Sequence, residues 1–168
     1  MKALGMMLLF GVAACTTPGT AQEAASGTAM PATSAPFAGD WASCEGASTP
    51  EECARYALVQ RGGRICGTWS YVASGQAYQG RVIAQAISAT QARRTHVCGR
   101  PGSETGMDCE DGWESIDRPL LLCDGGLADL VGKDGTCLAD YQPAAARGGD
   151  KAALLAQPWV QRCLSTDR

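Results

Sequence analysis

Histidine, phenylalanine and charge are all scarce in this chain. Its 168 residues include one His and two Phe, and only 18% of the residues are charged. The 14 basic residues are outnumbered by 17 acidic ones and form no run, so the chain lacks the electrostatic footprint of proteins that bind nucleic acid. We therefore expect no nucleic acid among its partners.

The scarcity of histidine also bears on catalysis. The single His96 stands beside Cys98 in an alternating segment, and no Gly-x-Ser-x-Gly segment is present to hold a nucleophile, so the sequence does not predict triad chemistry. No pair of cysteines has the C-x-x-C spacing typical of zinc sites. We predict no catalytic residue, no metal site and no cofactor.

The N-terminus has the features of an export signal. Lys2 is followed by an apolar run that is too short to cross a bilayer. The segment Val12-Ala13-Ala14-Cys15 resembles the lipobox of bacterial lipoproteins. That resemblance implies that residues 1–14 are removed and that Cys15 carries the lipid. Because Thr16 rather than Asp follows, it also implies the outer membrane, with the protein on the periplasmic face.

The next segment has the composition of a flexible tether. Residues 16–36 are almost all Ala, Thr, Ser, Pro and Gly, with Glu23 as the single charge, and such a segment cannot form a core. We therefore divide the chain into a signal peptide at 1–14, a lipidated Cys15 with its tether at 15–36, and a folded domain at 37–168.

Setting Cys15 aside leaves an even number of cysteines in an exported domain, which predicts four disulfides. Eight cysteines allow about a hundred pairings, but local hairpins favour three of them, Cys44–Cys53, Cys98–Cys109 and Cys123–Cys137. The remaining pair is then Cys66–Cys163, which would hold the C-terminal segment.

Short alternating runs broken by Gly, Asp and Pro predict strands throughout the domain. The clearest hairpin joins 56–60 to 64–71 through Gly62-Gly63, and in its second strand Ile65, Trp69 and Tyr71 share one face. Further strands are expected at 80–87, 94–98, 120–123, 127–131 and 136–141.

A short helix is expected from Asp150, ending before Pro158. The predicted fold is therefore all-β: a small antiparallel barrel or sandwich stapled by disulfides, with a short C-terminal helix. The segment Gly39-Asp40-Trp41 resembles the first strand of lipocalin-like and avidin-like barrels, and Ala139-Asp140-Tyr141 resembles a second lipocalin signature.

Acidic residues gather between the predicted strands, at positions 104–117. Paired carboxylates there would suit a hydrolase, but catalysis depends on a separation that sequence does not give. A calcium loop starting at Asp108 would need Gly and Glu where Trp113 and Pro119 stand. A solvated surface loop is the simpler interpretation.

The segment 71–80 has the Tyr, Ser, Gly and Gln content of a recognition loop. Within it, Ser74-Gly75-x-x-Tyr78 resembles a motif of the membrane-bound and periplasmic inhibitors of c-type lysozyme. The resemblance implies that Ser74 enters the lysozyme cleft together with a lysine, for which Lys133 is the candidate. Ser74, Gly75, Tyr78 and Lys133 are thus the predicted binding residues.

These observations favour a non-catalytic binding or inhibitory module held on the outer membrane. Its expected partners are the membrane, reached through the lipid, and an envelope protein or a cell-wall enzyme such as lysozyme. Two alternatives stay open: an envelope hydrolase that uses the carboxylates of 104–117, and a purely structural envelope protein.

Overall fold

The computed structural model describes residues 34–44, 46, 52–145 and 150–165. The predicted signal peptide, the lipidation site Cys15 and the tether up to residue 33 lie outside the described residues. Neither helix in the described part of the chain combines the length and apolar character needed to cross a membrane.

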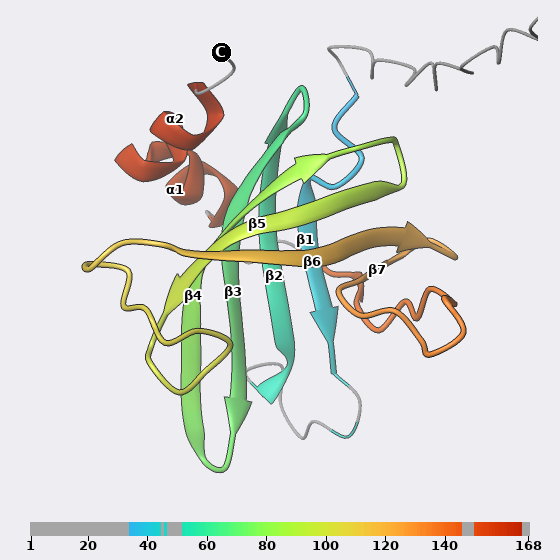
Figure 1. Cartoon of the computed structure of the whole chain (residues 1–168), viewed down its shortest axis with the longest axis horizontal. Helices are drawn as coiled ribbons and strands as arrows, with labels where there is room; N and C mark the ends of the chain where they lie inside the picture. The colour runs from blue at the N-terminus through green and yellow to red at the C-terminus, as the bar shows by residue number, and fades with distance from the viewer. Residues whose placement is uncertain (1–33, 45, 47–51, 146–149, 166–168) are drawn as a thin grey trace, which may run out of the picture.

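The domain is a nearly closed antiparallel barrel of eight strands in the order β7-β6-β5-β4-β3-β2-β1-β8 (Figure 1). Leu127, on β7, exchanges two backbone hydrogen bonds of 2.8 and 3.0 Å with Tyr141, which directly precedes β8. This contact brings the two ends of the sheet together. The all-β prediction is confirmed, and the barrel rather than the sandwich is the architecture. The strands are β1 Gly39–Ser43, β2 Ala54–Arg61, β3 Arg64–Ala73, β4 Gln76–Ala86, β5 Gln91–Gly99, β6 Glu114–Cys123, β7 Gly126–Ala128 and β8 Gln142–Pro143.

The turns form where the sequence permits a left-handed backbone. Gly62 has φ 55° in the two-residue turn between β2 and β3, and Asp124 and Gly125 have φ 51° and 78° between β6 and β7. A positive φ at these positions matches the twist of the flanking strands. The hairpin predicted at Gly62-Gly63 is therefore present, and a second hairpin joins β6 to β7.

Alternation along the strands separates a barrel interior from an outer face. The interior cluster contains Ile65, Trp69 and Val82, with Tyr71 packed against it. The ring of Trp69 lies against Gly80 and Gly99, where any Cβ atom would collide with the indole. The two glycines face each other on β4 and β5, so their missing side chains provide the room that this large ring needs.

Two short helices, α1 Asp150–Ala156 and α2 Pro158–Ser165, cover part of the outer face. The helix predicted from Asp150 and ending before Pro158 is present as α1. The second helix was not predicted: Pro is well suited to the first turn of a helix, and Pro158 starts α2. Trp159, Val160 and Leu164 pack with Val59 and Cys66 in a second, outer cluster.

The four disulfides are Cys44–Cys53, Cys66–Cys163, Cys98–Cys109 and Cys123–Cys137, which are the pairs that the spacing favoured. Several boundaries differ from expectation. Of the predicted loop 71–80 only Ser74 and Gly75 lie between strands, because β3 extends to Ala73 and β4 begins at Gln76, and the strand expected at 127–131 ends at Ala128. The acidic segment ends earlier, because β6 begins at Glu114. Residues 136–141 form isolated bridges rather than a strand, since Gly132 and Gly135 fold this segment into a tight turn closed by backbone hydrogen bonds.

Candidate functional site: a polar groove on the outer face

The outer face of β2, β3 and β4 changes character along the strands. Val59, Cys66 and Ile83 form one cross-strand row, and the two helices cover it. The next rows are polar: Thr68 pairs with Arg81, and Ser70 pairs with Gln79. Trp159 of α2 contacts Arg81, and Thr68, Ser70 and Gln79 line an open depression beside the helices.

Two adjoining hollows of about 340 and 510 Å³ occupy this place. They share Thr68, Ser70 and Gln157, and we refer to them together as the outer groove. Both volumes lie in the range of small-molecule sites. The smaller hollow is also lined by Asp40, Arg55, Tyr56, Ala57, Ala153 and Leu154, and the larger one by Trp69, Gln79, Gly80, Arg81, Gly99, Arg100, Asp108, Cys109 and Glu110.

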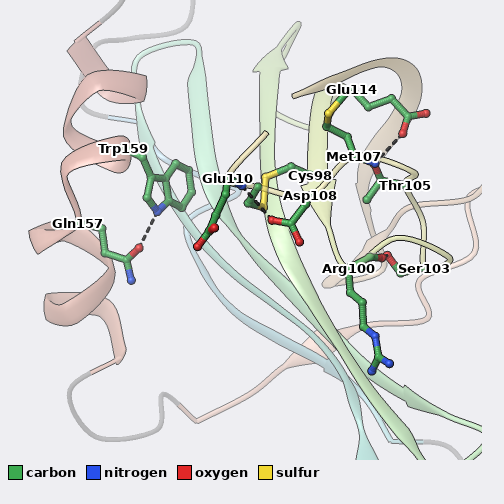
Figure 2. Close-up of a disulfide and its surroundings, with 11 residues drawn as sticks. Cys98, Arg100, Ser103, Thr105, Met107, Asp108, Glu110, Glu114, Gln157 and Trp159 are labelled. Carbon is green, nitrogen blue, oxygen red and sulfur yellow. Dashed lines mark hydrogen bonds between the residues drawn. A yellow bond between two sulfur atoms is a disulfide. The ribbon is translucent and has the colours of Figure 1, made fainter. Parts of the chain in front are cut away.

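Two disulfides attach segments that flank the outer groove. Cys66–Cys163 ties α2 to the outer side of β3. Cys98–Cys109 ties the loop between β5 and β6 to the end of β5, as Figure 2 shows. Trp159 of α2 also contacts Trp113 of this loop region, with ring centroids 5.8 Å apart. The groove is therefore held open by covalent links, which reduces the ordering cost of binding.

The groove carries both signs of charge. The guanidinium of Arg81 lies 5.4 Å from the ring of Trp159, and that of Arg100 lies 5.6 Å from the ring of Tyr78. Asp108 and Glu110, two positions apart in the sequence, both lie on the loop wall of the groove. Figure 2 shows their side chains pointing the same way. One oxygen of Asp108 accepts the backbone N–H of Glu110 at 2.9 Å.

The other acidic residues of the predicted segment 104–117 have different roles. Glu114 accepts the Thr105 hydroxyl at 2.6 Å and the Gly106 N–H at 3.0 Å, and these hydrogen bonds hold the pKa of Glu114 below its ordinary value. Asp117 pairs with Arg93 on the surface. The acids therefore do not form one carboxylate site.

Glu104 belongs to a buried network inside the barrel. Arg94, which is 2% exposed, donates to Glu104 at 3.1 Å, to the Tyr56 hydroxyl at 2.8 Å and to the Asp129 carbonyl at 3.0 Å. Tyr56 and Tyr141 both donate to the Asp129 carboxylate. Burial raises the pKa of both tyrosines, and Asp129 adds to the rise. Both hydroxyls therefore stay protonated and can donate hydrogen bonds. The network closes the barrel.

The predicted binding residues lie at two places. Ser74 and Gly75 form the exposed tip of the β3–β4 hairpin, with φ 53° and 73°. Tyr78 lies further up the hairpin, with its ring stacked on Tyr71 at 5.1 Å. Lys133 is exposed in the loop after β7, and Figure 1 shows that loop and the hairpin tip well apart. The structure therefore does not bring Ser74 and Lys133 together, and their role in binding stays a prediction.

His96 lies on the outer face of β5, half-buried, with its ring nitrogen Nδ1 2.9 Å from the Thr95 hydroxyl. It does not line either hollow of the groove. Across the described ranges, no group of three or more His, Cys, Asp or Glu side chains is placed to hold a metal ion.

The outer groove was not predicted from the sequence. Its signal was present in the polar outward positions Thr68 and Ser70 of β3, which alternate with the buried Trp69. The partners of these residues on β4, the loop and α2 come from distant parts of the chain, and only the register of the strands brings them together. Comparison with known protein families, characterised proteins and solved structures found no match for this chain.

Proposed function

We propose that this protein is a lipid-anchored binding module of the bacterial cell envelope, and that its outer groove takes up a polar ligand without changing it chemically. The observation that carries the binding part is the groove itself: a polar depression flanked by α2 and by the loop between β5 and β6, each of which is attached to the barrel by a disulfide. Preformed, largely rigid sites of this size are typical of ligand binding.

The arrangement of the acids favours binding over hydrolysis. Glycoside hydrolases place two carboxyl groups on opposite sides of the bond that they cleave. In the groove, Asp108 and Glu110 share one wall, and Asp108 is already engaged as a hydrogen-bond acceptor. We therefore keep the hydrolase as the alternative that the same experiment tests.

The proposed location of the protein in the cell envelope rests on the N-terminal sequence alone. A lipid on Cys15 would hold the domain on the periplasmic face of the outer membrane by the segment 16–36. Replacing Cys15 with Ser should move the protein from the membrane fraction to the soluble periplasm. A Cys15→Ser protein that still pellets with membranes after a carbonate wash would contradict the anchor.

Binding is tested with the exported Cys15→Ser protein and a soluble digest of bacterial cell wall. Ser70→Trp places an indole on the floor of the groove, and Ser115→Trp places the same group at an exposed serine of β6 that lines neither hollow. We expect calorimetry to show binding that Ser70→Trp abolishes and Ser115→Trp preserves. Mass spectrometry should recover the digest unchanged.

Two results would contradict the proposal. Equal binding by the Ser70→Trp and Ser115→Trp proteins would place the ligand elsewhere on the molecule. New cleavage products that disappear in the Glu110→Gln variant would show an enzyme and would favour the alternative.

A further inference from the structure

One end of the barrel is the end at which the described chain enters it. The register places Gly39, at the start of β1, beside Leu58 near the end of β2, and the turns β2–β3, β4–β5 and β6–β7 follow at the same end. Figure 1 shows the chain entering there, far from the tip of the β3–β4 hairpin. We call this the entry end, and the end with the hairpin tip the distal end.

The loop after β7 belongs to the entry end. Cys137 is bridged to Cys123, the last residue of β6, and Val131 pairs with Cys137 across the loop. Cys123 also pairs with Gly126 at the β6–β7 turn. The disulfide therefore holds residues 130–138 next to this turn, and we call them the bridged loop.

Exposed apolar side chains gather at the entry end. Five large apolar side chains are exposed in the described part of the chain, and four of them lie there. They are Ile87 in the β4–β5 turn, and Leu130, Val131 and Leu138 on the bridged loop, with exposed fractions of 42 to 58%. The fifth, Val72, lies near the distal hairpin tip. Single exposed apolar residues are ordinary, but three on one covalently closed loop favour a contact surface.

Charge is also divided between the two ends. The segment 104–117, which joins β5 to β6 at the distal end, has six acidic residues and no basic one. At the entry end, three basic residues balance three acidic ones around the turns and in the bridged loop: Arg61, Arg64, Lys133, Asp124, Asp134 and Asp140. An anionic surface is therefore repelled by the distal end and can approach the entry end.

The proposed lipid anchor brings a bilayer to the same end. Eighteen residues, 16–33, separate Cys15 from Ser34, the first described residue. A chain of that length spans at most about 65 Å. A short connection makes contact with the bilayer an intramolecular step, with an effective concentration on the order of millimolar. Weak apolar contacts are therefore sufficient to seat the domain.

Resting on the proposed lipid anchor, we propose that the entry end is a surface that seats the domain on a phospholipid bilayer. The exposed apolar side chains of the β4–β5 turn and the bridged loop enter the headgroup region, and Arg61 and Lys133 meet anionic headgroups. Apolar area buried at this boundary and nearby basic groups both add to membrane affinity. The outer groove lies on the side of the barrel and its loop wall at the distal end, so seating leaves the groove uncovered.

The test uses the lipidated protein in nanodiscs of phosphatidylethanolamine and phosphatidylglycerol. A gadolinium chelate on a fraction of the lipid headgroups broadens the NMR signals of amides that lie close to the bilayer. We expect the amide signals of Ile87, Leu130 and Leu138 to broaden strongly, and those of Val72 and Ser74 to change little. Uniform broadening, or broadening that is strongest at the hairpin tip, would overturn the inference.

Variants assign the apolar contacts. Val131→Ser/Leu138→Ser should weaken seating, measured by the broadening at Ile87 and Leu130, by about 10- to 100-fold. The matched control is Val72→Ser, because Val72 is 40% exposed and Val131 42%, and it should leave the pattern unchanged. A full pattern in Val131→Ser/Leu138→Ser would show that the bridged loop is not the seat. Unchanged thermal unfolding midpoints establish that these variants fold.

A second pair of variants tests the charges. Arg61→Gln and Lys133→Gln should each weaken seating by about 5-fold on discs that contain phosphatidylglycerol. Neither should change it on discs of phosphatidylcholine alone, which carry no net charge. Equal effects on both kinds of disc would contradict the contact with anionic headgroups.

The outcomes separate this inference from the proposed function. If the protein stays on the discs while its amides broaden uniformly, the anchor stands and the seating surface is wrong. If the Cys15→Ser protein still pellets with membranes after a carbonate wash, the proposed anchor fails and the inference fails with it. A dimer of the Cys15→Ser protein that Val131→Ser/Leu138→Ser dissociates in the ultracentrifuge would show that a second copy covers the bridged loop, and would also overturn the inference.

Discussion

Arg94 is the residue on which the barrel interior depends most. It is almost fully buried and joins β5 to Tyr56 on β2, to Asp129 after β7 and to Glu104 in the loop. Burial alone lowers the pKa of Arg94, but its interactions with Tyr56, Asp129 and Glu104 outweigh this and raise it. The guanidinium is therefore a charged link between segments that lie far apart in the sequence.

Replacing Arg94 with Met should destabilise the protein by about 3–5 kcal/mol, because the buried Asp129 would lose its counter-charge. The adjacent Arg93 provides a matched control. Its ion pair with Asp117 is exposed, so Arg93→Met should cost less than about 1 kcal/mol. Urea unfolding of the oxidised proteins measures the free energy of unfolding of both variants. Equal losses would show that the buried network stabilises the protein no more than the exposed ion pair does.

Gly80 is a second critical position, because the ring of Trp69 and the carbonyl oxygen of Cys98 occupy the place of its Cβ. Gly80→Ala should cost about 1–3 kcal/mol of folding free energy through overpacking. At Gly106, no atom lies within 4 Å of the position that a Cβ would take, so Gly106→Ala should be close to neutral. Thermal unfolding compares the two, and an equally stable Gly80→Ala protein would contradict the close packing of Trp69.

At the scale of elements, the loop between β5 and β6 is fixed at two places. Cys98–Cys109 holds its second half, and Glu114 holds Thr105 and Gly106, near its middle, by hydrogen bonds. Because the charged form of Glu114 accepts these bonds, its folded pKa is depressed. Its contribution to stability is complete above the unfolded pKa of about 4.3 and is lost as the pH falls through the folded value.

An NMR titration tests this attachment of the loop. The side-chain carboxyl signal of Glu114 and the amide proton of Gly106 should move together, with a midpoint below about 4.3. In Glu114→Gln, the amide of Gly106 should no longer titrate with that midpoint. A midpoint for Glu114 at or above about 4.3 would mean that the charged form is not the one that holds the loop.

The helices α1 and α2 depend on one covalent link. Cys66–Cys163 closes a sequence separation of 97 residues, whereas Cys44–Cys53 closes one of 9. The chain-entropy relation gives losses of about 4.7 and about 2.7 kcal/mol for removing the two bridges. Denaturant unfolding of the Cys66→Ala/Cys163→Ala and Cys44→Ala/Cys53→Ala proteins should show this order, and the reverse order would contradict the role of the long-range bridge.

Turn chemistry and alternation made much of the fold predictable from sequence. Gly62-Gly63 marked the hairpin, and the opposite faces of Ile65 and Cys66 correctly separated the interior cluster from the outer one. Local spacing led to the disulfide pairs because three of the four bridges close separations of 9 to 14 residues. These features depend on neighbours in the chain.

Features that depend on distant segments were not predictable. The start of β6 was interpreted as a loop because Glu114 and Asp117 are polar. The hairpin partner β7 pairs only with Leu121–Cys123 at the other end of that strand. Pro158 was interpreted as a stop although it also starts a helix. The outer groove needs the register of three strands, two helices and a loop, and no local pattern encodes that assembly.

For the whole molecule, these parts give a disulfide-linked barrel with an open polar groove on its outer face. The bridge between Leu127 and Tyr141 brings the two ends of the sheet together, and closure protects the edges of a sheet. The helices cover the apolar part of the outer face and leave its polar part free. The central claim is therefore that the ligand occupies the outer groove.

Chemical-shift mapping with the soluble cell-wall digest tests this claim residue by residue. We predict that the amide signals of Thr68, Ser70 and Arg81 on the groove floor move on titration, together with the side-chain amide of Gln157. The signals of Ser74 and Gly75 at the hairpin tip should stay in place. Shifts confined to the hairpin tip, with the signals of the groove floor unmoved at saturation, would contradict the claim.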